Sequence, residues 1–245
     1  MGYHFKTLDK LVEDARDQEN KFVYVYGQKS TDDNPVRNNF LITSLSFPNS
    51  FNSIKNLRQV TWSGYVIGLD PSTFGESVLP TKNKKVTAQT AYYTIENTFK
   101  RMSKLEKGGK LPIDLKDPEI KKLINNPKRV HYRALPTHLW DSEGESKTKG
   151  RNLNNYLDTA SYNFLRKKSL EAIQLQITVP GNISINAGDG IKVEIPRMQV
   201  KRKKAELDKV YSGTYLVGGI EHYYRVSEMK TTLHLLKDSI KVAPK

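Results

Sequence analysis

Histidines are the side chains of this sequence most able to bind a metal ion or transfer a proton. No two of them have the i, i+4 spacing of a helical zinc pair; they are His4, His131, His138, His222 and His234. His222 and His234 fall on strands expected to be neighbours. The sequence pattern indicates no nearby carboxylate that would orient the two rings for metal binding, so they are more typical of ordinary sheet residues. We assign them no role, and the sequence predicts no metal site and no cofactor.

The acidic residues offer no catalytic arrangement either. Asp189 lies between two glycines, in a composition typical of a tight turn. Asp141, Glu143 and Glu145 alternate along one segment and could hold a cation weakly, although their polar neighbours favour a solvated loop. Gly-x-Ser-x-Gly, Walker and Gly-x-Gly-x-x-Gly motifs are absent, and so is cysteine, with its thiolate and disulfide chemistry. We therefore expect a protein that is not an enzyme.

Basic residues are the clearest chemical feature of the chain. Lys and Arg number 40 against 26 Asp and Glu, a net charge of +14. One cluster falls in a single predicted loop, the basic loop (residues 197–209), and consists of Arg197, Lys201, Arg202, Lys203, Lys204 and Lys209. A second occupies one predicted helix: Lys100, Arg101, Lys104 and Lys107. Either cluster could contact phosphates or an acidic protein, or could simply be a solvated surface that discourages strand pairing.

The first half of the chain mixes predicted strands with a long excursion. Apolar spacing predicts an amphipathic helix over residues 5–19. Runs rich in β-branched and aromatic residues predict antiparallel strands, over residues 22–26, 40–47 and 58–69. The excursion from residue 71 to residue 150 contains one predicted helix, residues 90–107, ended by Gly108 and Gly109. Its remaining Lys-rich stretches have too little apolar surface for a core.

The last third of the chain is the most regular. A helical stripe runs from Leu153 to Leu165 and ends in the cations at 166–168. Strict alternation over residues 173–179 then places Leu175 and Ile177 inward and the intervening glutamines outward. Short strands separated by turns follow, at residues 183–185, 191–195, 213–224 and 230–236. A helix followed by such strands predicts a small antiparallel barrel.

Three regions follow from these patterns. They are residues 1–70, a helix with the strands of a first β unit; residues 71–150, an insertion with one helix and Lys-rich loops; and residues 151–245, a helix with the C-terminal barrel unit. The fold class is mainly β with α (α+β). The hydrophobic fraction of 37% is below the usual range, which predicts a subunit stabilised by its neighbours. No apolar run is long enough to span a membrane, and no signal peptide is expected.

Two stretches resemble the central baseplate hub protein of contractile-tailed bacteriophages. The C-terminal stretch consists of Gly188-Asp189-Gly190-Ile191, Pro196, residues 212–217, His222 and residues 231–239. It is similar to the closing strands of the tube-type β-barrel in these hubs. The N-terminal stretch, residues 2–11, is similar to a helix entry inside hub chains. Together the two stretches cover roughly a third of the chain, and the resemblance does not include the further barrel that such hubs carry before this segment.

The resemblance implies a structural virion protein made in the host cytoplasm and located in the tail baseplate. It implies a homotrimer that joins the tail tube protein to the cell-puncturing spike protein, contacts other baseplate subunits and lines the channel for DNA ejection. Phage DNA would meet the channel transiently. An alternative from another class is a basic β-barrel module that binds single-stranded nucleic acid. This alternative ranks second because the tyrosines fall mostly in predicted strands, where packing in the sheet accounts for their presence without base stacking.

Overall fold

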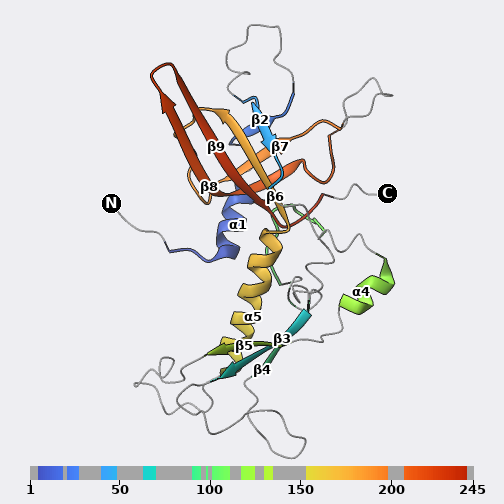
Figure 1. Ribbon diagram of the computed structural model, residues 1–245. Coiled ribbons are helices and arrows are strands. Elements are labelled where there is room, and N and C mark those ends of the chain that lie inside the picture. Colours follow the sequence, from blue (N-terminus) through green and yellow to red (C-terminus); the bar gives the residue numbers. More distant parts are fainter. Residues whose placement is uncertain are drawn as a thin grey trace, which may run out of the picture. The chain divides into compact units, whose positions relative to one another are not determined.

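A computed structural model of the chain describes its helices and strands (Figure 1). The described residues are 5–18, 21–27, 40–48, 63–69, 90–94, 98, 101–110, 117–124, 130–134, 153–197 and 207–241. They belong to two compact units, and the chain passes between these units more than once. The first unit comprises residues 1–52, 102–116 and 168–245, and the second comprises residues 53–101 and 117–167. The three-region division along the sequence stays a prediction.

A six-stranded sheet forms the centre of the first unit, in the order β1-β7-β8-β9-β6-β2. Its strands are β1 (Val23–Val25), β2 (Ser44–Ser46), β6 (Ile173–Pro180), β7 (Gly190–Glu194), β8 (Gly213–Arg225) and β9 (Glu228–Lys237). Neighbouring strands are antiparallel except β1 and β7, which are parallel, so the sheet is mixed. The predicted α+β, mainly β fold class is confirmed. Residues 183–185 lie in a turn-rich connection and form no strand there.

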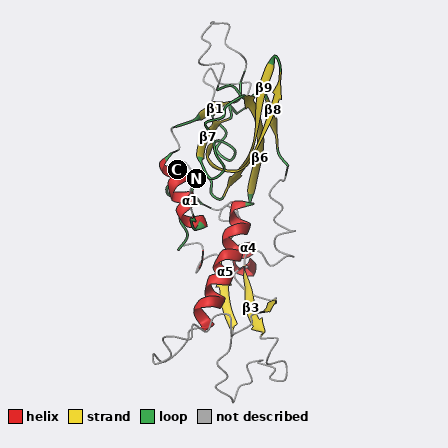
Figure 2. Cartoon of the chain, turned by 90° about the vertical axis from the view of Figure 1, so that its left-hand side faces the viewer, coloured by secondary structure: helices red, strands yellow, loops and turns green. Residues whose placement is uncertain are grey.

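The two ends of this sheet are linked by backbone hydrogen bonds. Val25 N donates to Phe40 O at 3.0 Å, and Ile42 N donates to Val25 O at 3.0 Å. One residue further on, Thr43 N donates to Thr178 O of β6 at 2.8 Å. The segment before β2 therefore contacts β1 on one side and β6 on the other, which curls the sheet into a barrel-like form (Figure 2).

Alternation along β6 fills the barrel with aliphatic side chains. Ile173, Leu175, Ile177 and Val179 are buried, while the residues between them are only partly buried, so the predicted register is confirmed. A buried aliphatic side chain contributes about 1.5–3 kcal/mol. The same core takes Tyr24 from β1 and Ile42 from the segment before β2. Residues from the first fifth of the chain thus complete a barrel built mostly from its last third.

Helix α1 (Leu8–Asp17) packs on the outside of this barrel, within the helix predicted over residues 5–19. Thr7 caps it, since its hydroxyl accepts a hydrogen bond from Lys10 N at 3.3 Å. The helix buries Val12 and Ala15. A side chain at Gly190 would place its Cβ 1.8 Å from Ala15 O, so α1 contacts the bare backbone of β7.

The second unit contains a three-stranded sheet in the order β4-β3-β5. Its strands are β3 (Ser63–Leu69), β4 (Thr90–Thr94) and β5 (Val130–Ala134). The helix predicted over residues 90–107 is wrong at Thr90–Thr94, which form a strand, and at residues 101–107, which lie in turns and bends. That segment, Thr-Ala-Tyr-Tyr-Thr, carries the β-branched and aromatic residues that favour an extended strand, and it pairs antiparallel with β3.

Two helices lie close to these strands in the sequence: one between β4 and β5, and one after β5. Helix α4 (Pro118–Ile124) lies in the Lys-rich stretch for which no element was expected. Its first turn is supported by Asp117, whose Oδ1 accepts from Glu119 N at 2.9 Å. Helix α5 (Leu153–Leu170) confirms the predicted helix and extends two residues beyond its basic end, of which Arg166 is fully buried. No described helix is long and apolar enough to cross a membrane.

Because Gly190 lies directly against Ala15, we expect Gly190→Ala to force α1 away from β7. The substitution should lower the free energy of unfolding by about 1–3 kcal/mol, the usual cost of overpacking. Chemical denaturation followed by circular dichroism measures this change. Gly27→Ala is the control, because nothing lies within 4 Å of a Cβ built at Gly27. Equal stability of the two variants would contradict the close contact of α1 with β7.

Candidate functional site: a buried lysine at the neck of the basic loop

The structure fixes the two ends of the basic loop. Pro196 and Leu207 form an isolated β-bridge, and Asp208 N donates to Ile195 O at 2.8 Å. Arg197 and Lys209, at the two ends of the loop, are both exposed. The other four predicted contact residues, Lys201, Arg202, Lys203 and Lys204, lie outside the described residues.

A tight turn over residues 207–212, called the neck here, includes the last residues of the basic loop. Asp208 Oδ1 accepts hydrogen bonds from Val210 N and Tyr211 N, both at 2.8 Å. Ser212 is bound to Ile195 in both directions: its Oγ accepts from Ile195 N at 2.9 Å and donates to Ile195 O at 3.0 Å. These side-chain bonds replace a regular strand pairing, so the base of the loop has one defined conformation.

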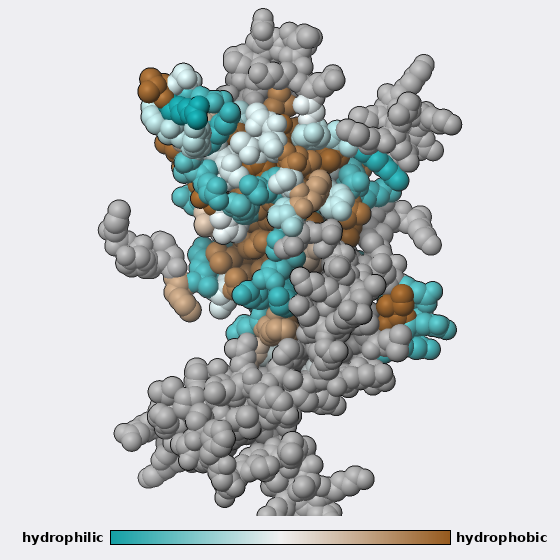
Figure 3. Space-filling view, viewed as in Figure 1, coloured by the Kyte–Doolittle hydropathy of each residue, from teal (hydrophilic) through white to brown (hydrophobic). Residues whose placement is uncertain are grey.

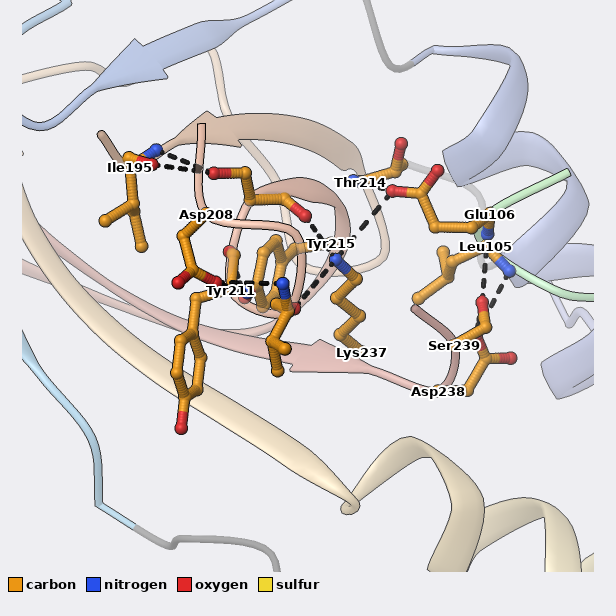
Figure 4. Close-up of polar contacts among 12 residues, drawn as sticks. Leu105, Glu106, Ile195, Asp208, Tyr211, Thr214, Tyr215, Lys237, Asp238 and Ser239 are labelled. Atoms are coloured by element: carbon orange, nitrogen blue, oxygen red, sulfur yellow. Dashed lines mark hydrogen bonds and ion pairs between the residues drawn. The ribbon is translucent and has the colours of Figure 1, made fainter. Parts of the chain in front are cut away.

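Lys237 of β9 lies fully buried beside this neck (Figure 4). Its Nζ donates to Ser212 O at 2.5 Å and to Val210 O at 3.3 Å. The same ammonium lies 3.8 Å from Glu106 Oε1 and 5.2 Å from the centre of the Tyr215 ring. All of these partners belong to the chain itself, an arrangement suited to holding backbone in place rather than to attacking a substrate.

Glu106 comes from a distant part of the sequence, the segment Met102–Lys110, called the strap here. Glu106 Oε1 accepts from Thr214 N at 2.7 Å, which places the carboxylate between β8 and Lys237. Gly213 makes room for it, because a Cβ there would lie 2.0 Å from Glu106 Oε1 and the residue has φ +130°. Any other residue at position 213 would be strained and would also collide with this carboxylate.

The strap is attached to the chain after β9 by four more hydrogen bonds. Leu105 N donates to Asp238 Oδ1 at 3.1 Å, and Glu106 N donates to Ser239 Oγ at 3.0 Å. Lys110 and Ile240 exchange two backbone hydrogen bonds, of 3.0 and 2.8 Å. Leu105 is itself fully buried, in a cluster with Val12 of α1. The strap therefore closes one side of the barrel with both apolar and polar contacts.

Burial sets the protonation of this network. Removal from water lowers the pKa of Lys237 to about 8, while Glu106 and Asp238 oppose that shift. Burial also raises the pKa of the Tyr215 hydroxyl, which donates to Tyr211 O at 2.6 Å. Lys237 is thus charged at neutral pH, and its charge is stabilised by the neck carbonyls and Glu106.

The histidines on the β8–β9 hairpin do not meet. His222 Nδ1 lies 3.0 Å from Thr231 Oγ1, on the face of β9 that is buried. His234 Nε2 lies 2.9 Å from Glu221 Oε1, on the opposite and more exposed face. Within the described part of the chain, no group of three or more His, Asp or Glu residues is arranged to hold a metal ion. Asp189 caps its turn, accepting from Asn186 N at 2.9 Å.

Other residues weighed in the sequence take no part in the network. His131 lies on β5, in the second unit, and its side chain is outside the described residues. His4, His138, Asp141, Glu143 and Glu145 also lie outside the described residues. Of the second basic cluster, Lys104 lies in the strap and donates to Gly109 O at 3.2 Å.

Sequence reasoning missed both members of the buried ion pair. A signal for Lys237 was present, because alternation along β9 puts it on the same face as Leu233 and Leu235. Nothing in the sequence predicted that Glu106 is buried. It lies between Lys104 and Lys107, a pattern typical of the solvated face of a helix.

Comparison with known proteins gave no family model and no curated protein that matches this chain. Solved structures similar to this chain include two tail proteins, one of them from a prophage. One is the 43 kDa tail protein of prophage MuSo2 from Shewanella oneidensis, with 11% identity, TM-score 0.41, and coverage of 91% of this chain and 45% of that one. The other is a tail protein from Neisseria meningitidis MC58, with 14% identity, TM-score 0.36, and coverage of 89% and 43%. This chain spans less than half of either protein, and TM-scores below 0.5 establish neither a shared fold nor a shared function.

Because the pKa of Lys237 falls from 10.5 unfolded to about 8 folded, the unfolded chain binds more protons between these values. The free energy of unfolding should therefore rise with pH in this window, by about 2 kcal/mol between pH 8 and pH 10 from this group. Lys237→Met should lack that rise. Urea denaturation of both proteins at several pH values measures the difference in slope, and parallel pH profiles would contradict the assignment.

Proposed function

We propose that this chain is a structural subunit of a phage tail baseplate hub. The observation that carries the proposal is the structure formed by residues Gly188 to Ser239, because the sequence of this stretch resembles the closing strands of a tube-type barrel. In this structure the stretch contributes β7, β8 and β9 to the barrel-like sheet. The residues that end it, Asp238 and Ser239, fix the strap.

In this role the chain joins the tail tube to the cell-puncturing spike and lines the channel through which DNA is ejected. Its partners are two further copies of itself in a trimer, the tail tube protein, the spike protein and other baseplate subunits. Its location is the virion tail baseplate. A net charge of +14 supports contact with acidic surfaces, since a strongly cationic protein attracts them over several ångströms.

The basic loop is the proposed contact surface. Its ends are fixed by the neck, and Arg197 and Lys209 are exposed beside them. Cations this close in sequence repel one another, so an acidic neighbour would stabilise them. We assign the loop to an acidic surface of a neighbouring subunit, with transient contact to phage DNA in the channel. The loop takes no part in catalysis.

One observation favours the second candidate, a barrel that binds single-stranded nucleic acid. Tyr223 and Tyr224 on β8 have exposed fractions of 47% and 77%. The guanidinium of Arg225 lies 5.1 Å from the centre of the Tyr223 ring. Exposed aromatic rings beside a cation are what stacking on unpaired bases requires.

A complementation experiment tests the hub role. Cells that produce the particles but lack this chain receive either the wild type or the variant with Lys201, Arg202, Lys203 and Lys204 all changed to alanine. Without the chain we expect no complete tails by electron microscopy. The quadruple variant should restore fewer tails, and its deficit relative to the wild type should be largest at low salt and shrink as salt rises, because salt screens the four charge contacts that only the wild type makes. Complete tails without the chain would overturn the hub role.

Two measurements on the purified variant separate the alternatives. Its melting temperature should stay close to that of the wild type, since an exposed charge contributes only about 0–1 kcal/mol to folding. Its affinity for a single-stranded oligonucleotide is measured over a salt series. Four lost phosphate contacts should reduce the slope of log affinity against log salt concentration by about 3. If the variant assembles normally but shows this reduced slope, the nucleic-acid function replaces the hub role.

A further inference from the structure

The outer part of strand β8 has an open edge. β8 pairs with β7 only from Gly213 to Leu216, whereas its pairing with β9 continues to Arg225. The far side of β9 is covered by β6 as far as Lys230. Figure 1 shows this hairpin extending beyond the other strands of the sheet. Among the described residues, no strand pairs with the free edge from Gly219 to Arg225, which we call the β8 edge.

The turn of the hairpin shows which backbone groups point outward. A two-residue turn follows Arg225, so the pair that closes the hairpin is hydrogen-bonded. Hydrogen-bonded and non-bonded pairs alternate along an antiparallel ladder. The backbone groups of Arg225, Tyr223 and Glu221 therefore point toward β9. Those of Tyr224 and His222 point toward the open edge and are available to another strand.

The side chains along this edge are exposed and alternate in character. Glu221, Tyr223 and Arg225 share one face, and Arg225 lies against the Tyr223 ring. Tyr224 lies on the other face, and Val226 in the turn is fully exposed. Figure 3 shows hydrophobic surface at the end of this hairpin, next to hydrophilic surface. An exposed edge that carries aromatic side chains is a template for strand pairing.

We propose that two copies of this chain associate by antiparallel pairing of their β8 edges, centred on Tyr223. In this register Glu221 lies opposite the partner's Arg225, and Arg225 lies opposite the partner's Glu221. The two Tyr223 rings lie between these ion pairs. His222 and the partner's Tyr224 exchange backbone hydrogen bonds, as do Tyr224 and the partner's His222. Every outward-pointing backbone group at positions 222 and 224 then has a partner.

Charge selects this register over its neighbours. A shift of two residues in either direction places Glu221 or Arg225 opposite a tyrosine and breaks both ion pairs. A shift of one residue sets outward-pointing groups opposite groups already bonded to β9. The sequence Glu-His-Tyr-Tyr-Arg is therefore complementary to itself when read in the opposite direction, as a two-fold contact requires.

Such a contact closes on itself and stops at two copies. It differs from the cyclic contacts of a three-subunit ring, so it does not depend on the proposed tail function. The aromatic pair and the two ion pairs all stabilise the contact, as directly opposite side chains do in an antiparallel sheet.

Sedimentation equilibrium of the purified full chain tests the pairing. The wild type should show a concentration-dependent association of two copies, in addition to any trimer that the chain forms. Glu221→Arg and Arg225→Glu each set like charges opposite one another, and should each weaken the dimer about tenfold. An equimolar mixture of these two variants should restore the wild-type dissociation constant, because each cation then meets an anion. Glu119→Arg and Lys122→Glu, the same charge changes on exposed positions of α4, are the matched controls and should leave the dimer unchanged.

Three results would overturn the proposal: a wild-type chain that stays monomeric at high concentration, a self-association that neither charge reversal weakens, or a mixture that fails to regain the lost affinity. None of them bears on whether the chain is part of a tail. The complementation experiment can fail while the dimer persists, so the two proposals fail separately.

Discussion

Lys237 carries its charge at a fully buried position, and the surrounding structure is arranged to stabilise that charge. Three segments do so: the neck supplies two carbonyl oxygens, the strap supplies the Glu106 carboxylate, and β8 supplies the Tyr215 ring. A buried charge without such partners costs several kcal/mol. The ammonium therefore requires all three segments to be in place together, and the base of the basic loop is fixed as a consequence.

The same interdependence runs through the whole barrel unit. Its regular strands come from the last third of the chain, but Tyr24 and Ile42 complete the core, and the bonds between Val25 and residues 40–42 link the ends of the sheet. The strap reaches Asp238 and Ser239 across 133 positions of sequence. Contacts so distant in sequence cost loop-closure entropy before they stabilise anything. The unit should consequently fold as one cooperative body rather than strand by strand.

Local pattern was enough to predict elements whose environment repeats with a fixed period. The alternation over β6 and the helical conformation of α5 were predicted correctly because both follow from a pattern that repeats along the local sequence. The helix predicted from residue 90 was wrong at Thr90–Thr94, where pairing with β3 decides the conformation. The parallel pairing of β1 with β7 and the buried Glu106 depend on contacts far away in sequence, which no local pattern encodes. The burial of Lys237 could have been predicted from the alternation of buried and partly buried residues along β9.

The strap is an integral part of the barrel, held by the network around Lys237. Native-state hydrogen exchange of the Leu105, Glu106 and Thr214 amides tests this directly, because Asp238, Ser239 and Glu106 side chains accept their hydrogen bonds. We predict that these three amides exchange with the same free energy as the β9 amides that bond to β6, close to that of global unfolding. Exchange of the strap amides at a much lower free energy, with the β9 amides still protected, would show that the strap detaches from an intact barrel and would contradict the account.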